Sequence, residues 1–318
     1  MTAAIGRLLL TRFLLSLATL VFVASAVFAI TNLLPGDVAQ ELLGQAATPE
    51  AVAGLRAALG LDVPPLQRYL AWLGNFVTGN LGNSLVNGQP VTALIGSRIG
   101  NSLLLAAITA LVAVPIAIGL GITAAVWRGS LYDRLVGAAT VLVVSVPEFL
   151  VASTAVLIFA VHLQWVPALS QLGRISGLAD VVRVFALPVM TLTFVVVAQM
   201  ARMTRAALVD VLSSSYVEMA RLKGAGPIRI VVWHALPNAI GPIANAVAFS
   251  LSFLLGGVII VETIFSYPGI AKLMVDGVAT RDLPLVQACA MLFCGAYLVL
   301  VTAADVAAIL ANPRLRKG

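Results

Sequence analysis

Charged side chains are scarce in this sequence of 318 residues, where Asp, Glu, Lys and Arg make up 10% of the total. Soluble domains average about 25% charged residues, so this chain has too little polar surface to cover a globule in water. Hydrophobic residues make up 61%, and they come in long blocks. Such blocks are typical of membrane-spanning helices, and the composition therefore predicts an all-α membrane protein.

The motifs of several catalytic and nucleotide-binding classes are missing. No G-x-x-x-x-G-K-[ST] sequence occurs, and Gly-Leu-Gly at 119–121 lacks the third glycine of a dinucleotide-binding fingerprint. Neither H-E-x-x-H nor G-x-S-x-G is present. We therefore expect a protein that is not an enzyme and holds no cofactor of its own.

Cysteine and histidine are also rare, with two of each. Cys289 and Cys294 lie in one apolar run, which does not form a metal-ligand or disulfide pattern, so we expect inert buried thiols. His162 and His234 fall on opposite sides of the membrane in the topology derived next. The sequence therefore predicts no metal site.

Six apolar segments are each about long enough to cross a hydrocarbon core of roughly 30 Å. They are 13–30, 103–127, 135–161, 184–201, 239–261 and 283–304. The fourth is the shortest and contains Pro188. The first resembles a cleavable signal, with Arg7 and Arg12 before it and Ala-Ser-Ala at 24–26, but its length favours a retained helix.

The distribution of basic residues predicts the orientation. With the N-terminus inside, only seven of the 19 Lys and Arg residues fall on outer segments: Arg56, Arg68, Arg98, Arg174, Arg183, Lys272 and Arg281. Positive charge concentrates on the cytoplasmic side of membrane proteins, so both termini are expected in the cytoplasm. Because the basic residues are spread along the chain, the net charge of +6 does not indicate a nucleic-acid partner.

The longest predicted outer loop, 31–102, carries two amphipathic patterns. The first follows Thr48, a suitable N-cap with Pro49 at the first helical position, and the second follows Pro64-Pro65. Gly-Asn-Leu-Gly-Asn-Ser-Leu at 79–85 has the composition of a turn. We expect two short helices outside the membrane.

One ionisable residue stands out within the predicted spans, Glu148 in Ser-Val-Pro-Glu-Phe at 145–149. Such a carboxylate either lines a polar path through the membrane or lies near a helix end. An ion-coupled secondary carrier would place several ionisable groups in its spans, so it is the weaker alternative. A membrane scaffold, the other alternative, would need no path at all.

The stretch SYVEMARLKGAGPIRIVVWHALPN, residues 215–238, is polar although it separates two apolar segments. A helix is predicted over 213–223, where Ser215 and Glu218 fit a capping box. Gly224 stands where a residue of positive φ ends a helix, and Pro227 is suited to start a second helix that runs to about His234. Long ordered connections are more often functional than structural.

Glu218-Met219-Ala220, then Gly224, then His234-Ala235-Leu236-Pro237 resemble in sequence and spacing the EAA signature of ABC-importer permeases. The one departure is Met219 where the signature has alanine. The resemblance implies that a coupling helix near 213–224 docks on a separate ATPase subunit. The residues implied in this contact are Glu218, Met219, Ala220, Gly224, His234, Leu236 and Pro237.

Several longer stretches resemble the dipeptide, oligopeptide and nickel permeases of that group: Pro-Gly-Asp at 35–37, and residues 59–73, 79–85 and 261–288. The resemblance implies six spans with the type I importer fold. It divides the chain into a first helix and outer loop at 1–97, a permease domain at 98–308 and a cytoplasmic tail at 309–318.

The resemblance also implies the partners. These are a second homologous permease, two ATP-binding subunits that hold ATP and Mg, an extracytoplasmic substrate-binding protein and the lipid bilayer of the cell membrane. A dipeptide or oligopeptide is the expected substrate, with nickel, glutathione or another small solute as alternatives.

Overall fold

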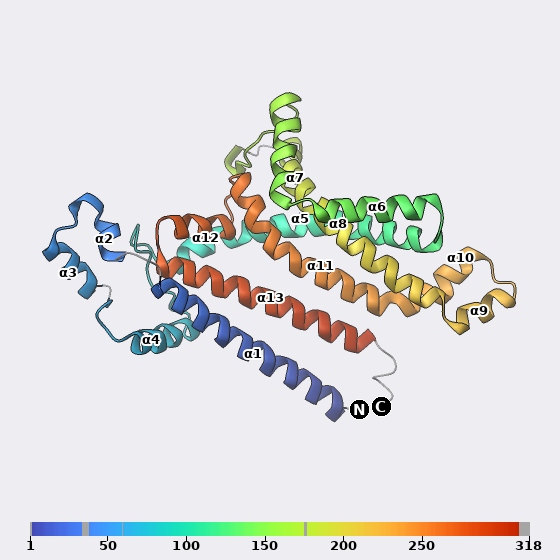
Figure 1. The fold of residues 1–318 in the computed structure, drawn as a ribbon, viewed down its shortest axis with the longest axis horizontal. Coiled ribbons are helices and arrows are strands. Elements are labelled where there is room, and N and C mark those ends of the chain that lie inside the picture. Colours follow the sequence, from blue (N-terminus) through green and yellow to red (C-terminus); the bar gives the residue numbers. More distant parts are fainter. Residues whose placement is uncertain (1, 34–37, 59, 175–176, 312–318) are drawn as a thin grey trace. The chain divides into compact units, whose positions relative to one another are not determined.

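The computed structural model describes residues 2–33, 38–58, 60–174 and 177–311, which fold into helices joined by turns (Figure 1). The α-helices are α1 Thr2–Leu33, α2 Val38–Leu43, α3 Pro49–Ala58, α4 Pro65–Val77, α5 Val91–Val126, α6 Leu131–Ser145, α7 Glu148–Ala155, α8 Leu178–Leu212, α9 Ser215–Leu222, α10 Pro227–Arg229, α11 Leu236–Ile264, α12 Ile270–Ala279 and α13 Leu283–Ala311. Short 3₁₀ turns lie at Gly44–Ala46 (η1) and Leu172–Arg174 (η3), and π-helical segments at Val156–His162 (η2) and Ile230–Ala235 (η4). The Pro-Gly-Asp motif at 35–37 and the tail beyond residue 311 lie outside the described residues.

Among the described residues, five helical stretches are long and apolar enough to cross a membrane, and there are six if a bent pair of helices is counted as one span. The five are Leu10–Thr31, Val91–Val126, Leu178–Leu212, Pro227–Ile264 and Leu283–Val306. They agree with five of the six predicted segments, which confirms the prediction of an all-α membrane protein.

The third predicted segment, 135–161, is wrong as a continuous helix. α6 ends at Ser145, and the pair Leu131–Ser145 and Glu148–His162 is bent by 96°. Val146 is extended (φ −89°, ψ 126°), as expected of a residue that precedes a proline. Pro147 therefore breaks the span in two.

The fourth segment was predicted too short. α8 runs for 35 residues with Pro188 inside it, and Pro188 is itself buried. A proline inside a helix removes one backbone hydrogen bond, but buried neighbours such as Phe185, Leu192 and Met200 hold α8 together through packing.

The chain divides into two compact units, and the first contains residues 101–268 with both ends of the chain. Its extracytoplasmic end, by the predicted orientation, is tied by hydrogen bonds. The fully buried Tyr267 donates to the Asn101 carbonyl oxygen at 2.7 Å, and Asn101 Nδ2 donates to the Pro268 oxygen at 2.7 Å. Ser102 donates to the buried Glu262 carboxylate at 2.5 Å. Burial, and then the charge of Glu262, raise the pKa of Tyr267, so its hydroxyl remains a donor.

At its other end, the first unit has a small apolar core. Its buried members, from α5, α8, η4 and α11, are Ala125, Leu208, Ala235, Ala239 and Ile243. The same core is packed by Leu212, the last residue of α8, and by Leu236, the first of α11. It therefore joins the two helices that flank the polar stretch 215–238.

The second unit contains residues 14–100 and 269–296. Its core includes Val91, Ile95, Ile270, Leu273 and Leu285. The buried Asp282 accepts hydrogen bonds from the Ser84 hydroxyl and, at 3.1 Å, from the Leu85 backbone N–H. These contacts fix the turn at 79–90 against the start of α13.

The predicted helices of the outer loop are confirmed as α3 and α4. Thr48 accepts the Ala51 N–H at 3.3 Å, as an N-cap does. The predicted turn is confirmed as well, since Gly79 and Gly82 have positive φ. The helix α2, a third helix in this loop, and the helix α12 were not predicted.

Candidate functional site

The polar stretch folds as a helical hairpin. α9 ends at Leu222, Gly224 reverses the chain with φ +81°, and α10 begins at Pro227. Figure 1 shows this hairpin beyond the ends of α8 and α11. The predicted helix, turn and second helix are confirmed, although the second helix continues through the π-helical segment η4 into α11 without a break.

The predicted capping box is wrong. The N-cap of α9 is Ser214, one residue before the predicted cap, and it makes no side-chain cap. Its hydroxyl instead donates to the Val211 carbonyl oxygen at 2.5 Å. Glu218 therefore does not serve as a cap, and its carboxylate is exposed in the first turn of α9.

The hairpin has a buried face and an exposed face. Val217, Ala220 and Ile230 are buried against the rest of the unit. On the exposed side lie large apolar residues: Met219 is 53% exposed, Leu222 77%, Ile228 79% and Trp233 75%. Several large apolar side chains this exposed in one short stretch are available for contact with a membrane or a partner protein.

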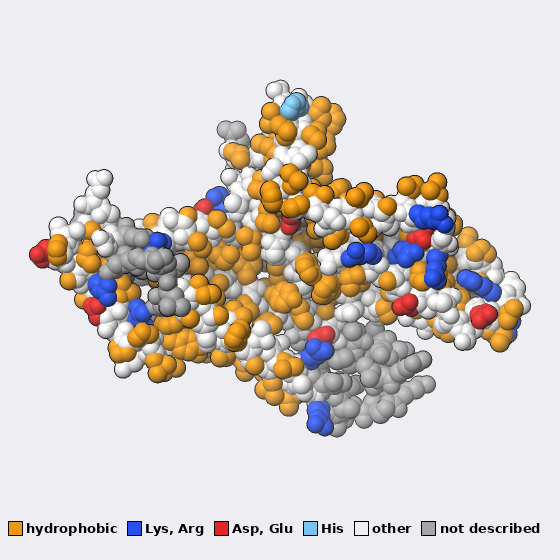
Figure 2. Space-filling model, viewed as in Figure 1, with side chains coloured by type: hydrophobic (Ala, Val, Ile, Leu, Met, Phe, Trp, Pro, Cys, Tyr) orange, Lys and Arg blue, Asp and Glu red, His pale blue; other side chains and the backbone are white. Residues whose placement is uncertain are grey.

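Charge surrounds these apolar side chains. Arg221, Lys223 and Arg229 are exposed on the same hairpin as Glu218. Figure 2 shows most Lys and Arg side chains at this end of the first unit over the ends of α6 and α8, beside the hairpin. The hairpin thus presents a mixed surface that is mainly basic, with apolar groups among the charges.

A hollow of about 400 Å³ lies within the hairpin. It is lined by Tyr216, Met219, Ala220, Lys223, Gly224, Ala225, Arg229 and His234. Four of the predicted site residues, Met219, Ala220, Gly224 and His234, are therefore brought together around one concavity.

The other predicted residues of the hairpin lie apart from this hollow. Glu218 is exposed on α9, Leu236 packs in the apolar core with Ala239, and Pro237 is exposed in the first turn of α11. His234 makes two local hydrogen bonds. Its Nδ1 atom lies 3.3 Å from the Arg229 carbonyl oxygen, and its own carbonyl oxygen accepts a hydrogen bond of 2.8 Å from the Asn238 side-chain amide.

Glu148 is not part of the hairpin. It is the first residue of α7, directly after the Pro147 break, and it lies against Gly257 of α11. Gly257 is 20 residues beyond Pro237, about 30 Å along a helix. The hairpin and Glu148 are thus contacted by opposite ends of α11.

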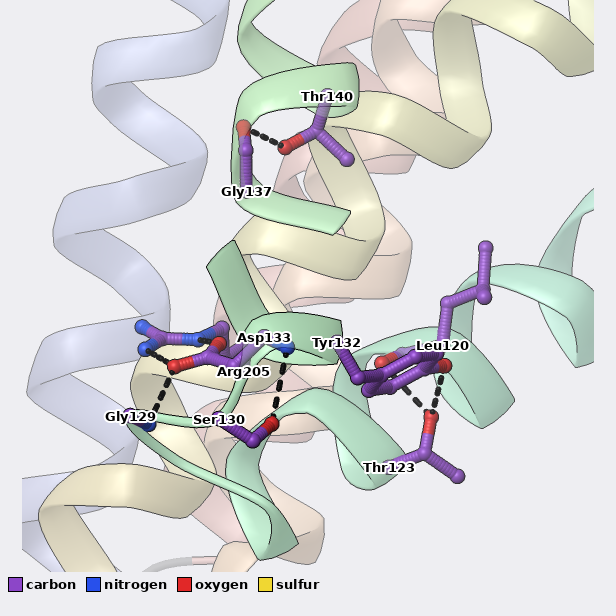
Figure 3. Close-up of polar contacts among 9 residues, drawn as sticks. All are labelled: Leu120, Thr123, Gly129, Ser130, Tyr132, Asp133, Gly137, Thr140 and Arg205. Carbon is purple, nitrogen blue, oxygen red and sulfur yellow. Dashed lines mark hydrogen bonds and ion pairs between the residues drawn. The ribbon is translucent and has the colours of Figure 1, made fainter. Parts of the chain in front are cut away.

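A third feature was not predicted. Asp133, in the first turn of α6, and Arg205 of α8 form an ion pair with two hydrogen bonds (Figure 3). Arg205 Nε donates to Oδ1 at 2.5 Å and Nη2 to Oδ2 at 2.8 Å. Oδ2 also accepts the Gly129 N–H at 2.9 Å, and Ser130 accepts the Asp133 N–H at 3.2 Å.

One part of this arrangement, the start of α6, can be recognised in the sequence. Ser130 followed three residues later by Asp133 has the pattern of a helix start. No local pattern, however, relates Asp133 to Arg205, which is 72 residues away.

Two family models match the chain. The model described as "Binding-protein-dependent transport system inner membrane component" matches residues 117–317, and the model of the N-terminal part of such membrane components matches residues 5–106.

Relatives are similar over nearly their whole length. A probable peptide ABC transporter permease protein from Sinorhizobium fredii is 33% identical over 312 residues, which cover 98% of this chain and 99% of the relative. A glutathione transport system permease protein from Escherichia coli is 37% identical over 298 residues, covering 94% and 95%. Its counterpart from Salmonella typhimurium is 36% identical over 307 residues, covering 96% and 98%.

One solved structure has a similar fold. It is the methionine ABC transporter MetNI in an inward facing conformation, with a TM-score of 0.54 and 18% sequence identity. The match covers 70% of this chain and 97% of the solved chain.

Proposed function

This chain belongs to the family of inner membrane components of binding-protein-dependent transport systems, and we propose that it forms half of the path by which such a system imports short peptides. The prediction of an ABC importer permease with its fold is confirmed, as is a multi-pass location in the inner membrane. The family consists of transporter permease subunits, so the chain is not itself an enzyme. The alternative of an ion-coupled secondary carrier is wrong, because the chain belongs to the family of binding-protein-dependent transport systems.

The substrate class rests on the relatives. One relative is described as a peptide permease and two as glutathione permeases. Glutathione is itself a tripeptide, so one class of substrate, a short peptide with a free ammonium group and carboxylates, covers both descriptions. Nickel or another small solute remains the alternative within the same class of importer.

The hairpin α9–Gly224–α10 is the observation on which the coupling proposal rests. Its exposed face carries apolar side chains among charges, and its buried face packs beside α8 and α11. We propose that Glu218, Met219, Ala220 and Gly224 form or shape the contact with an ATP-hydrolysing subunit. His234 would support the hairpin, and Leu236 and Pro237 would carry its movement into α11.

The remaining parts of the importer belong to the same proposal. A second homologous permease would complete the path, two ATP-binding subunits would hold ATP and Mg, and an extracytoplasmic binding protein would deliver the peptide. Both termini would be cytoplasmic. The first helix and outer loop (1–97), the permease domain (98–308) and the tail (309–318) would form its three regions.

Glu148 is proposed to line the path. It directly follows the break in the third span, where an irregular backbone interrupts the membrane helix. Broken helices in transporters commonly lie beside the substrate path. A carboxylate there would attract the ammonium group of a passing peptide.

The test is a crosslinking and transport experiment on the whole complex. Cys289 and Cys294 are replaced by serine, Lys223→Cys places a thiol beside Gly224, and the complex is purified from native membranes. We expect crosslinks to a nucleotide-binding subunit and, after reconstitution with the binding protein, ATP-dependent uptake of labelled short peptides. Purification of this chain without an ATPase, or uptake that does not depend on ATP, would refute the proposal.

A further inference from the structure

We propose that Asp133 and Arg205 are positioning residues for transport, and that their ion pair makes the cytoplasmic ends of α6 and α8 move as one block with the hairpin. Movement imposed on α9 would then reach α6 and, through it, the break at Pro147. This inference rests on the proposed function, in which an ATPase subunit moves α9.

The ion pair is well formed, with a buried carboxylate and a half-buried guanidinium. The Asp133 side chain is 7% exposed and that of Arg205 is 33% exposed. Arg205 uses two nitrogens against two carboxylate oxygens, a bidentate geometry that fixes direction as well as distance. The Gly129 N–H occupies a further acceptor position on Oδ2, so the carboxylate is held by the α5–α6 turn and by α8 together.

α5 belongs to the same block. A Cβ atom on Gly121 would lie 2.6 Å from Thr204 Cβ and 2.7 Å from the Ala201 oxygen, so α5 and α8 are in backbone contact one residue before Arg205. Thr123 of α5 also shares a hydrogen bond of 2.8 Å with Tyr132 of α6.

The block is continuous with the hairpin. Arg205 lies two turns before Leu212, where α8 ends, and α9 begins three residues later at Ser215. Between them the apolar core, with Leu208 and Ala235 among its buried members, packs the end of α8 against η4 and α11.

The pair matters because apolar contact alone holds membrane helices weakly. In a bilayer, lipid tails are as apolar as the side chains that they replace, so there is little hydrophobic force between helices. The helix α8 could therefore slide along α6 by a small distance. A bidentate ion pair fixes both the direction and the distance between α6 and α8 and so resists such sliding, and α6 then follows α8 as far as Ser145, where the 96° bend begins.

The experiment compares transport with ATP hydrolysis in the complete importer, reconstituted with its ATPase subunits and binding protein. Asp133→Asn and Arg205→Gln break the pair. Arg202→Gln, on the same helix and exposed, and Arg134→Gln, on α6 and exposed, are the matched controls. We expect the pair variants to lose about tenfold in peptide transported per ATP hydrolysed while the controls stay near wild type.

A rescue separates positioning from general stability. In the Cys289→Ser, Cys294→Ser background, Asp133→Cys with Arg205→Cys removes both charges. A short bismaleimide that joins the two thiols then links α6 to α8 covalently. Transport per ATP should fall in the double variant and recover on crosslinking. No recovery in a complex that remains assembled would overturn the inference.

A distance measurement tests the block directly. Spin labels replace Leu135 of α6, which is 59% exposed, and the exposed Lys223 at the end of α9. In wild type the distance between them should be the same without nucleotide and with trapped ATP, whereas Asp133→Asn should make it change. A distance that changes in wild type overturns the inference even if uptake is ATP-dependent, whereas a lack of ATP-dependent uptake by wild type defeats the proposed function instead.

Discussion

The Glu148 carboxylate fills the space that a side chain on Gly257 would need. A Cβ atom built on Gly257 would lie 2.5 Å from Oε1 and 3.0 Å from Oε2 of Glu148. Glu148 comes directly after the break between α6 and α7. The part of α11 that contacts its carboxylate is Gly257, which has no side chain. The position of the proposed path residue is therefore set in part by the absence of a side chain on α11.

Gly257→Ala should reduce peptide uptake several-fold without loss of the folded protein. The new methyl group meets the far end of a flexible side chain, so the carboxylate moves and the backbone need not. Uptake into proteoliposomes, normalised to permease content, measures the effect. Gly256→Ala is the matched control, because no atom lies within 4 Å of its added Cβ, and equal uptake by both variants would contradict a role for the position of Glu148.

Gly224→Val should uncouple the permease from its ATPase. A left-handed backbone costs a residue with a Cβ about 1–2 kcal/mol, and a β-branched side chain fits it poorly. The hairpin would open, while the rest of the first unit would keep its packing. Co-purification of the ATPase subunits should fall and membrane levels should stay unchanged.

The control for this variant is Gly226→Ala. Gly226 has φ −68°, which alanine adopts freely, and its added Cβ meets nothing within 4 Å. Normal ATPase binding by Gly224→Val would show that the shape of this turn does not matter for docking.

Gly121→Ala should destabilise the first unit. Its Cβ would come within 2.8 Å of three atoms, one of them the backbone oxygen of Ala201, so helices α5 and α8 would have to separate. Overpacking of this kind costs about 1–3 kcal/mol. Thermal unfolding in mild detergent should show a lower midpoint than wild type, whereas Gly119→Ala, with open space around it, should not.

Asp282→Ala should loosen the turn at 79–90 in the second unit. The change leaves the Ser84 hydroxyl and the Leu85 N–H without their buried acceptor, at about 1–3 kcal/mol for each unsatisfied group. Limited proteolysis within the turn should become faster. Asp276→Ala removes a helical ion pair with Lys272, in which the Asp276 side chain is 52% exposed, and such a pair is worth about 0.2–0.5 kcal/mol. Equal cleavage of the two variants would argue against a structural role for Asp282.

The parts of the fold that depend on local chemistry could be predicted from the sequence. Thr48 with Pro49 marked the start of α3, and Gly224 with Pro227 marked the hairpin, because caps and turns are determined by one or two residues. The apolar segments predicted the spans because the lipid environment requires a long apolar helix whatever it packs against.

The rest depended on tertiary packing. Pro147 broke its span and Pro188 did not, although both lie in apolar segments; Pro188 is buried inside a long, well-packed helix, a context that no local pattern reveals. The pairing of Asp133 with Arg205, and of Glu148 with Gly257, joins residues far apart in the chain. Proximity of this kind follows from how the helices cross, and composition and periodicity do not encode it.

The π-helical segment Ile230–Ala235 has a further consequence for changes in chain length. A π turn holds one residue more than the α turn that it replaces. We expect deletion of Val232 to be absorbed by conversion to ordinary α-helix, with α11 unmoved against α8. The same deletion within α11 would rotate every later side chain by about 100°, so the π-helical segment is where this chain can lose a residue between the hairpin and the membrane at the lowest cost.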